Sequence, residues 1–216
     1  NYTLFFPGNA DVPALPAGDG FGAVRVLPTG QARFVGTLAD ATRVSGSATL
    51  SKSGLCPLYI PLYLGKGSLV SWLAFTNRAD DDLNGPSSWI KPADPMARYY
   101  HGGFTNELNI AGSGYVRPLP GTHPILNLAN SSVTFSGGDL YFTNLVALDL
   151  NSRVTNLSSN RFALSFSLAT GTFAGRATDP ANDESFSFKG AVMQKLNGGY
   201  GFLLQTNRSS RVTIAP

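Results

Sequence analysis

The sequence predicts an all-β protein, either an antiparallel meander barrel of about ten strands or a curled two-sheet sandwich. Three observations lead to this fold class: an internal repeat, apolar residues that alternate with a period of two, and a composition rich in glycine with only 13% charged residues. Barrels and sandwiches of this length are commonly single domains. We therefore expect one domain over residues 1–216.

The internal repeat consists of two similar segments, the pseudo-repeats at residues 21–76 and 162–214. Their shared motif is Phe-x-Gly-x-x-x-Asp, formed by Phe34, Gly36 and Asp40 in the first copy and by Phe173, Gly175 and Asp179 in the second. A residue that recurs at equivalent positions is usually structural. We expect both aspartates to cap turns by bonding to nearby backbone groups.

Alternating side chains define the strands within each copy. Val44, Ala48 and Leu50 share one face of the first copy with polar residues between them, and Phe162, Leu164 and Phe166 do the same in the second. A period of two is typical of a half-buried antiparallel strand. Each copy thus predicts a meander of about five strands.

Residues 77–161 separate the two copies and repeat nothing. The later part contains strand signals at 133–135 and 140–150, whereas 77–120 is interrupted by prolines and glycines. That earlier part is also rich in aromatic residues, which argues against disorder. We expect a loop-rich excursion packed against the barrel, and long ordered loops often carry function.

Charge and cysteine content exclude several classes of function. The net charge of +3 is scattered without a basic run, so nucleic-acid binding is not expected. A single cysteine, Cys56, and two histidines cannot form a disulfide or a zinc cluster, and no cofactor is expected. In a membrane barrel, apolar and polar residues alternate along strands of about ten residues. Here the polar residues that alternate with apolar ones lie on shorter strands interrupted by glycines, so we expect no membrane insertion. A signal for export, if there is one, lies outside this sequence.

An acidic cluster, Asp80, Asp81 and Asp82, is the longest run of like charge. Such a run is usually a solvated loop. Hard cations take several oxygen ligands from loops of this kind, so the three aspartates are weak candidates for a metal site.

Catalytic motifs are missing from the sequence: it has no nucleophile elbow, no His-Glu-x-x-His and no phosphate loop. His101, paired with Asp94 or Glu107, is a weak candidate for a small hydrolase acting on glycosides or esters. A structural role for His101 is favoured, and the chain is not expected to be an enzyme.

Aromatic residues in the excursion suggest binding instead. Flat rings suit the C–H face of a sugar while neighbouring polar groups bond its hydroxyls. The candidate ligand-binding residues are Trp89, Lys91, Arg98, Tyr99, Tyr100 and His101. The alternative is that these aromatics fasten the excursion to the barrel. Trp72 alternates with apolar residues, which is typical of packing or of a sheet surface.

Several short motifs together resemble a known module. They are Gly-Thr-Leu-Ala-Asp at 36–40, Pro-Leu-Tyr at 57–59, Gly-Lys-Gly-Ser-Leu at 65–69, Trp-Ile-Lys-Pro at 89–92, Tyr-His-Gly-Gly-Phe at 100–104, and Gly-Ala-Val at 190–192 followed by Gly-Tyr-Gly-Phe at 199–202. Over nearly the whole chain the sequence is similar to an all-β module at the C-terminal end of very large secreted surface proteins of environmental bacteria, often after immunoglobulin-like domains. The resemblance implies a secreted or cell-surface location and neighbouring domains as partners, and it assigns no catalytic residue.

Taken together, the sequence predicts a monomeric, non-catalytic extracellular module for binding or adhesion, with polysaccharide as a candidate partner. Two alternatives stay open at this point. One is the small hydrolase, and the other is a purely structural terminal domain of a multidomain surface protein.

Overall fold

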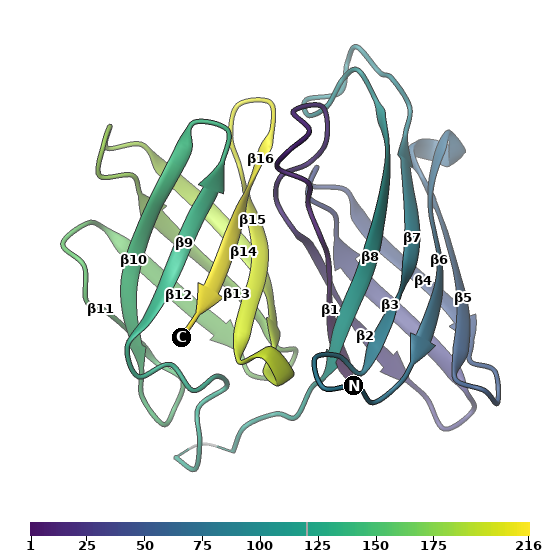
Figure 1. Cartoon of the computed structure of the whole chain (residues 1–216), viewed down its shortest axis with the longest axis horizontal. Helices are drawn as coiled ribbons and strands as arrows, with labels where there is room; N and C mark the ends of the chain where they lie inside the picture. The colour runs from purple at the N-terminus through teal and green to yellow at the C-terminus, as the bar shows by residue number, and fades with distance from the viewer. Residues whose placement is uncertain (120) are drawn as a thin grey trace.

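The computed structural model describes residues 1–119 and 121–216, which form two eight-stranded antiparallel sheets side by side (Figure 1). Each sheet curls into a nearly closed barrel. The predicted all-β antiparallel meander with two similar halves is confirmed, and the structure resolves it into sixteen strands in two sheets. The only helices in the described ranges are two 3-10 turns of three residues, far too short to cross a membrane.

The first sheet has the order β4-β3-β2-β1-β8-β7-β6-β5. The strands that come first and last in the chain, β1 and β8, pair with each other, and β4 and β5 lie at the two edges of the sheet. Its strands are β1 (Tyr2–Phe6), β2 (Gly20–Val26), β3 (Gln31–Thr37), β4 (Arg43–Thr49), β5 (Leu55–Leu62), β6 (Gly67–Phe75), β7 (Leu83–Lys91) and β8 (Phe104–Gly114). The 3-10 turn η1 (Tyr63–Gly65) joins β5 to β6.

The second sheet repeats this topology with the order β11-β10-β9-β16-β15-β14-β13-β12. Its strands are β9 (Ser131–Gly137), β10 (Leu140–Leu148), β11 (Val154–Asn156), β12 (Phe162–Ser167), β13 (Thr172–Thr178), β14 (Ser185–Met193), β15 (Gly198–Leu204) and β16 (Ser209–Ala215). The turn η2 (Gln194–Leu196) joins β14 to β15, as η1 joins β5 to β6.

The strand signals at 133–135 and 140–150 are confirmed by β9 and β10. The predicted loop-rich excursion at 77–120 is wrong in part, because this segment supplies β7 and β8 to the first sheet. Pro86 lies within β7, where the β6–β7 register is interrupted between Ser71↔Ser87 and Ala74↔Asn84. A strand tolerates a proline where a ladder bond is absent, so the prolines did not exclude strands here. Pro120, the last residue of the expected excursion, lies outside the described residues.

Each barrel is left open along one seam. β5 pairs only with β6, and it carries Pro57 and Pro61. A proline has no N–H to donate, so these residues fit only with their nitrogens toward β4. Few backbone N–H groups of β5 then remain to form hydrogen bonds with β4 across the seam. An edge strand with few N–H donors is also protected against pairing with strands of other chains.

The corresponding seam of the second barrel, between β11 and β12, is filled by asparagines. Asn160 donates from Nδ2 to Oδ1 of Asn144 at 3.0 Å and to the Thr178 carbonyl at 2.8 Å. Asn156 donates to the Asn160 carbonyl at 2.9 Å. Asn144 is fully buried, and this network provides partners for its polar atoms where no strand does.

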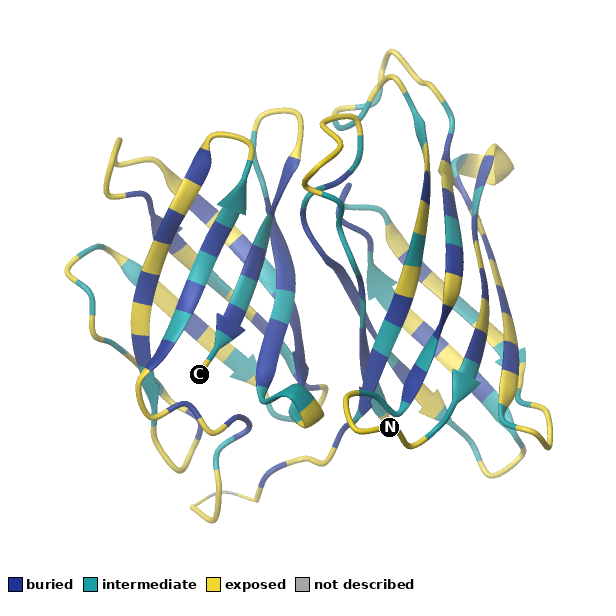
Figure 2. Cartoon of the chain, viewed as in Figure 1, coloured by how far each residue is buried: buried dark blue, intermediate teal, exposed yellow. Residues whose placement is uncertain are grey.

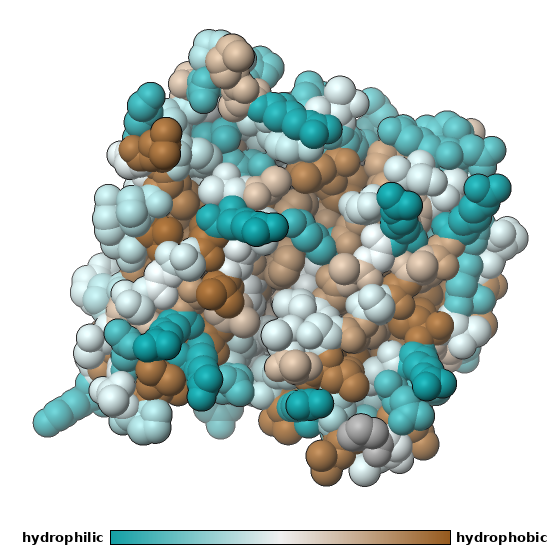
Figure 3. Space-filling model, turned by 180° about the vertical axis from the view of Figure 1, so that it is seen from behind, coloured by the Kyte–Doolittle hydropathy of each residue, from teal (hydrophilic) through white to brown (hydrophobic). Residues whose placement is uncertain are grey.

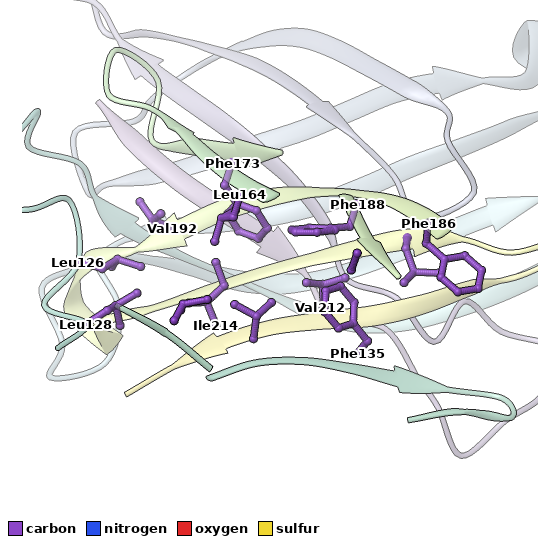
Figure 4. Packing of buried hydrophobic residues seen from close by; sticks show 14 of the residues in the cluster. Leu126, Leu128, Phe135, Leu164, Phe173, Phe186, Phe188, Val192, Val212 and Ile214 are labelled. Carbon is purple, nitrogen blue, oxygen red and sulfur yellow. The ribbon is translucent and has the colours of Figure 1, made fainter. Parts of the chain in front are cut away.

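Each barrel encloses its own hydrophobic core, and exposed and buried residues alternate along the strands (Figure 2). In the second barrel the rings of Phe135, Phe173 and Phe188 gather with Val212 and Ile214 (Figure 4). The first core is built around apolar residues from all eight strands, among them Leu4, Val24, Phe34, Val44, Leu58, Leu69, Trp89 and Ile110.

The repeated motif shapes both barrels in the same way. A Cβ atom on Gly36 would lie 2.5 Å from the Phe21 carbonyl oxygen, and one on Gly175 would lie 2.2 Å from the Ala163 oxygen. Glycine therefore allows close approach of neighbouring backbones. The Oδ1 atom of Asp40 accepts from the Thr42 N–H at 2.9 Å, and Asp179 accepts from Ala181 at the same distance. The predicted turn-capping role is confirmed for both aspartates.

The two barrels meet through β1 and β2 of the first sheet and β14 and β15 of the second. Phe5 stacks on Tyr200 with ring centroids 4.4 Å apart. Beside this pair, Phe21 and Phe202 belong to a small buried cluster that both sheets contribute to. The centre of the junction is therefore apolar, and two ion pairs, Asp19 with Arg211 and Asp82 with Lys195, also join the barrels.

Candidate binding site

The loop between β7 and β8, residues 92–103, holds four of the six predicted binding residues. Its backbone closes on itself, because the Asp94 N–H donates to the His101 carbonyl at 2.8 Å. The side chain of Asp94 accepts from the Met96 N–H at 2.9 Å. The loop is therefore ordered, as the sequence predicted.

Trp89 is not part of an open aromatic surface. It lies on the inward face of β7 with 2% of its surface exposed, and its ring meets Phe104 edge-on at 4.7 Å. Its Nε1 atom donates to the hydroxyl oxygen of Tyr63 at 2.9 Å. The period of two along β7 turns this residue toward the core, so the prediction that Trp89 stacks on a sugar is corrected.

Lys91 lies two residues further along the same inward face and forms a buried ion pair. Its Nζ atom is 2.9 Å from Oδ2 of Asp40, and the two side chains are 7% and 0% exposed. The Tyr63 hydroxyl donates to the same oxygen at 2.7 Å, and the lysine ammonium lies 4.2 Å from the Tyr63 ring centroid. Burial, followed by the nearby Asp40 charge, raises the pKa of Tyr63, which keeps its hydroxyl a donor.

A hollow of about 490 Å³ opens beside this ion pair. It lies between the η1 turn and the β7–β8 loop and is lined by Tyr63, Leu64, Lys66, Lys91, Pro92, Ala93, Asp94, Pro95 and Ala97. Tyr63 and Leu64 have φ angles of 52° and 58°, a left-handed conformation that side chains rarely adopt. The hydrogen bonds of Tyr63 hold this strained turn at the rim. The sequence pointed to Asp40 only as a turn residue and gave no signal for Tyr63.

The remaining predicted binding residues lie on the other side of the loop. Tyr100 bonds through its hydroxyl to Ser209 of the second barrel at 2.9 Å, and burial raises its pKa. Tyr100 and His101 line a smaller hollow of about 180 Å³ together with Arg208. Arg98 covers the Tyr99 ring at 5.2 Å. The six predicted residues are therefore not brought together. Trp89 lies in the core, Lys91 lines the larger hollow, and Tyr100 and His101 line the smaller one, whereas Arg98 and Tyr99 line neither.

The weak catalytic candidates are not brought into one constellation. His101 is exposed, and in the part of the chain that the structure describes no hydrogen bond or ion pair joins its side chain to Asp94 or Glu107. Glu107 lies on the outer face of β8 and accepts from the Ser88 hydroxyl at 2.6 Å. The hydrolase alternative gains no geometric support.

The acidic cluster contacts a cation that belongs to the protein itself. The ammonium of Lys195, from η2, lies 2.6 Å from Oδ1 of Asp82 and also donates to the backbone carbonyls of Arg78 and Asp81. Asp80 is exposed and takes no part. Among the described residues, no group of three or more acidic, histidine or cysteine side chains could hold a metal ion. The metal alternative is corrected, because a lysine fills the place of the cation.

Calcium is therefore expected to leave the melting temperature unchanged. A divalent ion would have to displace Lys195 from Asp82, and the shift at millimolar calcium should stay below about 1 °C. Differential scanning fluorimetry with and without the metal measures it. A rise of several degrees that chelator reverses would contradict this expectation.

The outer face of β5, β6 and β7 is the clearest exposed aromatic surface, and we call it the aromatic face. Tyr59 is 66% exposed and Trp72 is 60% exposed. The register pairs Trp72 with Pro57 and Tyr59 with Val70, so the two rings are diagonal neighbours across β5 and β6. None of the outward positions on these three strands is charged; they are Leu55, Pro57, Tyr59, Pro61, Ser68, Val70, Trp72, Ala74, Asn84, Pro86, Ser88 and Ile90.

The surface of the molecule seen from behind is different in character. There hydrophilic side chains are scattered among apolar ones (Figure 3). On β3 and β4, for example, the outward residues include Arg33 and Arg43. Of the two sequence interpretations of Trp72, the structure places it on the sheet surface. The outward residues around it are mainly apolar, and none on β5, β6 or β7 is charged.

Comparison with known proteins adds no further assignment. No protein-family model matches the chain, and neither the curated proteins nor the solved structures contain a match. The resemblance to a surface-protein module therefore stays a prediction. Any proposal about function depends on the geometry described above.

Proposed function

We propose that this protein is a non-catalytic extracellular module that adheres to an uncharged polysaccharide through the aromatic face. The observation that carries the proposal is the exposure of Trp72 and Tyr59 side by side on a surface without charge. The site thus moves from the β7–β8 loop, where the sequence analysis looked for it, to the outer wall of the first barrel.

The chemistry of this face suits a sugar polymer. Sugar rings present C–H groups that pack on aromatic faces, and their hydroxyls need hydrogen-bonding partners at the edges. Ser68 lies opposite Pro61 on β5 and Ile90 on β7, so a hydroxyl lies within the same surface as the apolar groups. A neutral polymer can cover the outward residues of β5 and β6 without removing a formal charge of these strands from water. The carboxylate of Glu107 on β8 borders the face where it accepts from Ser88.

The rings are also held in place before a ligand arrives. Both project from paired strands, and Pro57 and Pro61 restrict the backbone of β5 on either side of Tyr59. A ring whose backbone is fixed loses little conformational entropy on binding. A purely structural terminal domain would gain nothing from exposing a tryptophan in an apolar patch of this kind.

A pull-down on insoluble polysaccharides, with cellulose and chitin as neutral probes, tests the proposal. Trp72→Ala and Tyr59→Ala are each expected to weaken retention on the order of tenfold, as the loss of a central aromatic contact commonly does. Tyr141→Ala is the matched control, since Tyr141 is 78% exposed but lies on β10 of the second barrel. No retention of the wild-type chain, or equal loss in all three variants, would refute the proposal.

A further inference from the structure

A polar slot lies beside β8, separate from the aromatic face and from the hollows at the β7–β8 loop. Its volume is about 470 Å³. One wall is the segment that follows β1, from Pro7 to Asp11, and the other is Asn106–Asn109 of β8. Arg211 of the second barrel lines it as well.

The slot exists because neighbouring strands differ in length. β1 has five residues and β8 has eleven, and β1 pairs with β8 only at Ala111–Gly114. Above that level β8 pairs with β7 alone, so its other edge has no strand partner from residue 104 to 110 (Figure 1). A free edge presents a row of N–H and C=O groups that can pair with another extended chain.

Asn106 gives a second and independent indication of a ligand. Asn106 is among the residues that line the slot, and its side chain is 98% buried with no hydrogen-bond partner for Nδ2 among the described residues. A buried amide left without an acceptor is destabilising. A carbonyl oxygen brought into the slot would provide the missing acceptor.

The charges of the slot indicate the kind of chain that would bind. Arg211 is already paired with Asp19, with Nε and Oδ1 3.1 Å apart. Asp11 and Glu107 are exposed carboxylates without an ion-pair partner in the described chain. The net charge along the slot is negative, which favours a basic ligand.

We infer that this slot binds an extended peptide segment carrying a lysine or arginine side chain. The peptide adds as a strand to the free edge of β8, and one of its carbonyl groups accepts from Asn106. The basic side chain lies near Glu107. This inference does not depend on the polysaccharide proposal, because the aromatic face uses other strands.

Phage-displayed random heptapeptides, selected on the full chain and counter-selected on Asn106→Leu, provide the test. Enriched sequences should contain lysine or arginine, and as synthetic peptides they should bind the wild type with affinity that falls on the order of tenfold in Asn106→Leu. Glu107→Lys should weaken binding at least as much through charge reversal. Since Glu107 is exposed, this second variant is expected to fold normally.

Two further measurements complete the experiment. In NMR titrations with an enriched peptide, the backbone amides of residues 105–109 and the Asn106 side-chain amide should shift, and Trp72→Ala should bind the peptide normally. No enrichment over the Asn106→Leu chain, equal binding by Glu107→Lys, or shifts confined to other strands would overturn the inference. So would a response of the Asn106 amide to neutral oligosaccharides but to no peptide.

Discussion

Replacing Asp40 with asparagine is expected to lower the free energy of unfolding by about 3–5 kcal/mol, since this is the usual effect of removing one partner from a buried ion pair. The Asp40 side chain is fully buried, and its Oδ2 atom accepts from both Lys91 and Tyr63. Asparagine keeps an oxygen for the Thr42 N–H, but its amide group then meets two donors. Lys91 is left buried without its counter-charge.

The matched control for this prediction is Asp179→Asn. Asp179 occupies the same place in the repeated motif and caps its turn in the same way, but no ion pair to it occurs in the described chain. Asparagine caps turns as well as aspartate does, so this variant should lose less than about 1 kcal/mol. Urea unfolding of both variants measures the difference. Equal losses would mean that the ion pair contributes nothing beyond the turn.

Stability is expected to fall as the pH rises from about 4 to 7 because of Asp19 at the junction of the barrels. Burial raises the pKa of Asp19 from 3.8 to about 6, against the opposing effect of Arg211. The folded state therefore binds the proton more tightly than the unfolded state does. The stabilisation is complete below the pKa that Asp19 has in the unfolded chain, and it is lost as the pH rises through the pKa of Asp19 in the folded chain. For a shift of this size the loss is up to roughly 3 kcal/mol.

Comparison with Asp19→Asn isolates this effect from the other carboxylates. The free energy of unfolding of the wild type minus that of the variant should fall steadily, by up to roughly 3 kcal/mol, as the pH rises over that window. Asparagine does not titrate, and Arg211 keeps its hydrogen bond to the Gly8 carbonyl. A difference that is flat or grows with pH would show that Arg211 dominates and that the pKa of Asp19 is not raised.

The fold was largely readable from the sequence where the signals are local. Alternation around Val44 and Phe162 correctly marked strands, and Asp40 and Asp179 cap turns as predicted. The strands from 83 to 114 were missed because Gly85 and Pro86 interrupt the first of them and Pro92 and Pro95 lie between the two. Pro86 is tolerated at an interruption of the register, and only the pairing of β6 with β7 shows that.

The candidate sites were less predictable, because they depend on the direction in which side chains point. Trp89 and Trp72 both lie near polar residues in the sequence, but one faces the core and the other faces solvent. If β7 had been recognised as a strand, the inward direction of Trp89 would have been predicted, because Trp89 and Leu83 are an even number of residues apart and so lie on the same face. No sequence pattern would have shown that the side-chain Nδ2 of Asn106 lacks a partner, since that depends on which groups the fold places around it.

The sequence by itself determined the all-β class, the pseudo-repeats, the turn positions and the absence of a zinc or disulfide framework, because each depends on residues close together in the chain or on composition. Only the tertiary structure decided that there are two barrels, that Lys91 meets Asp40 from 51 residues away, and that Lys195 fills the acidic loop. It also decided which aromatic residues are exposed. Those outcomes depend on how distant strands pair and where the barrels touch, and nothing in the local pattern specifies either.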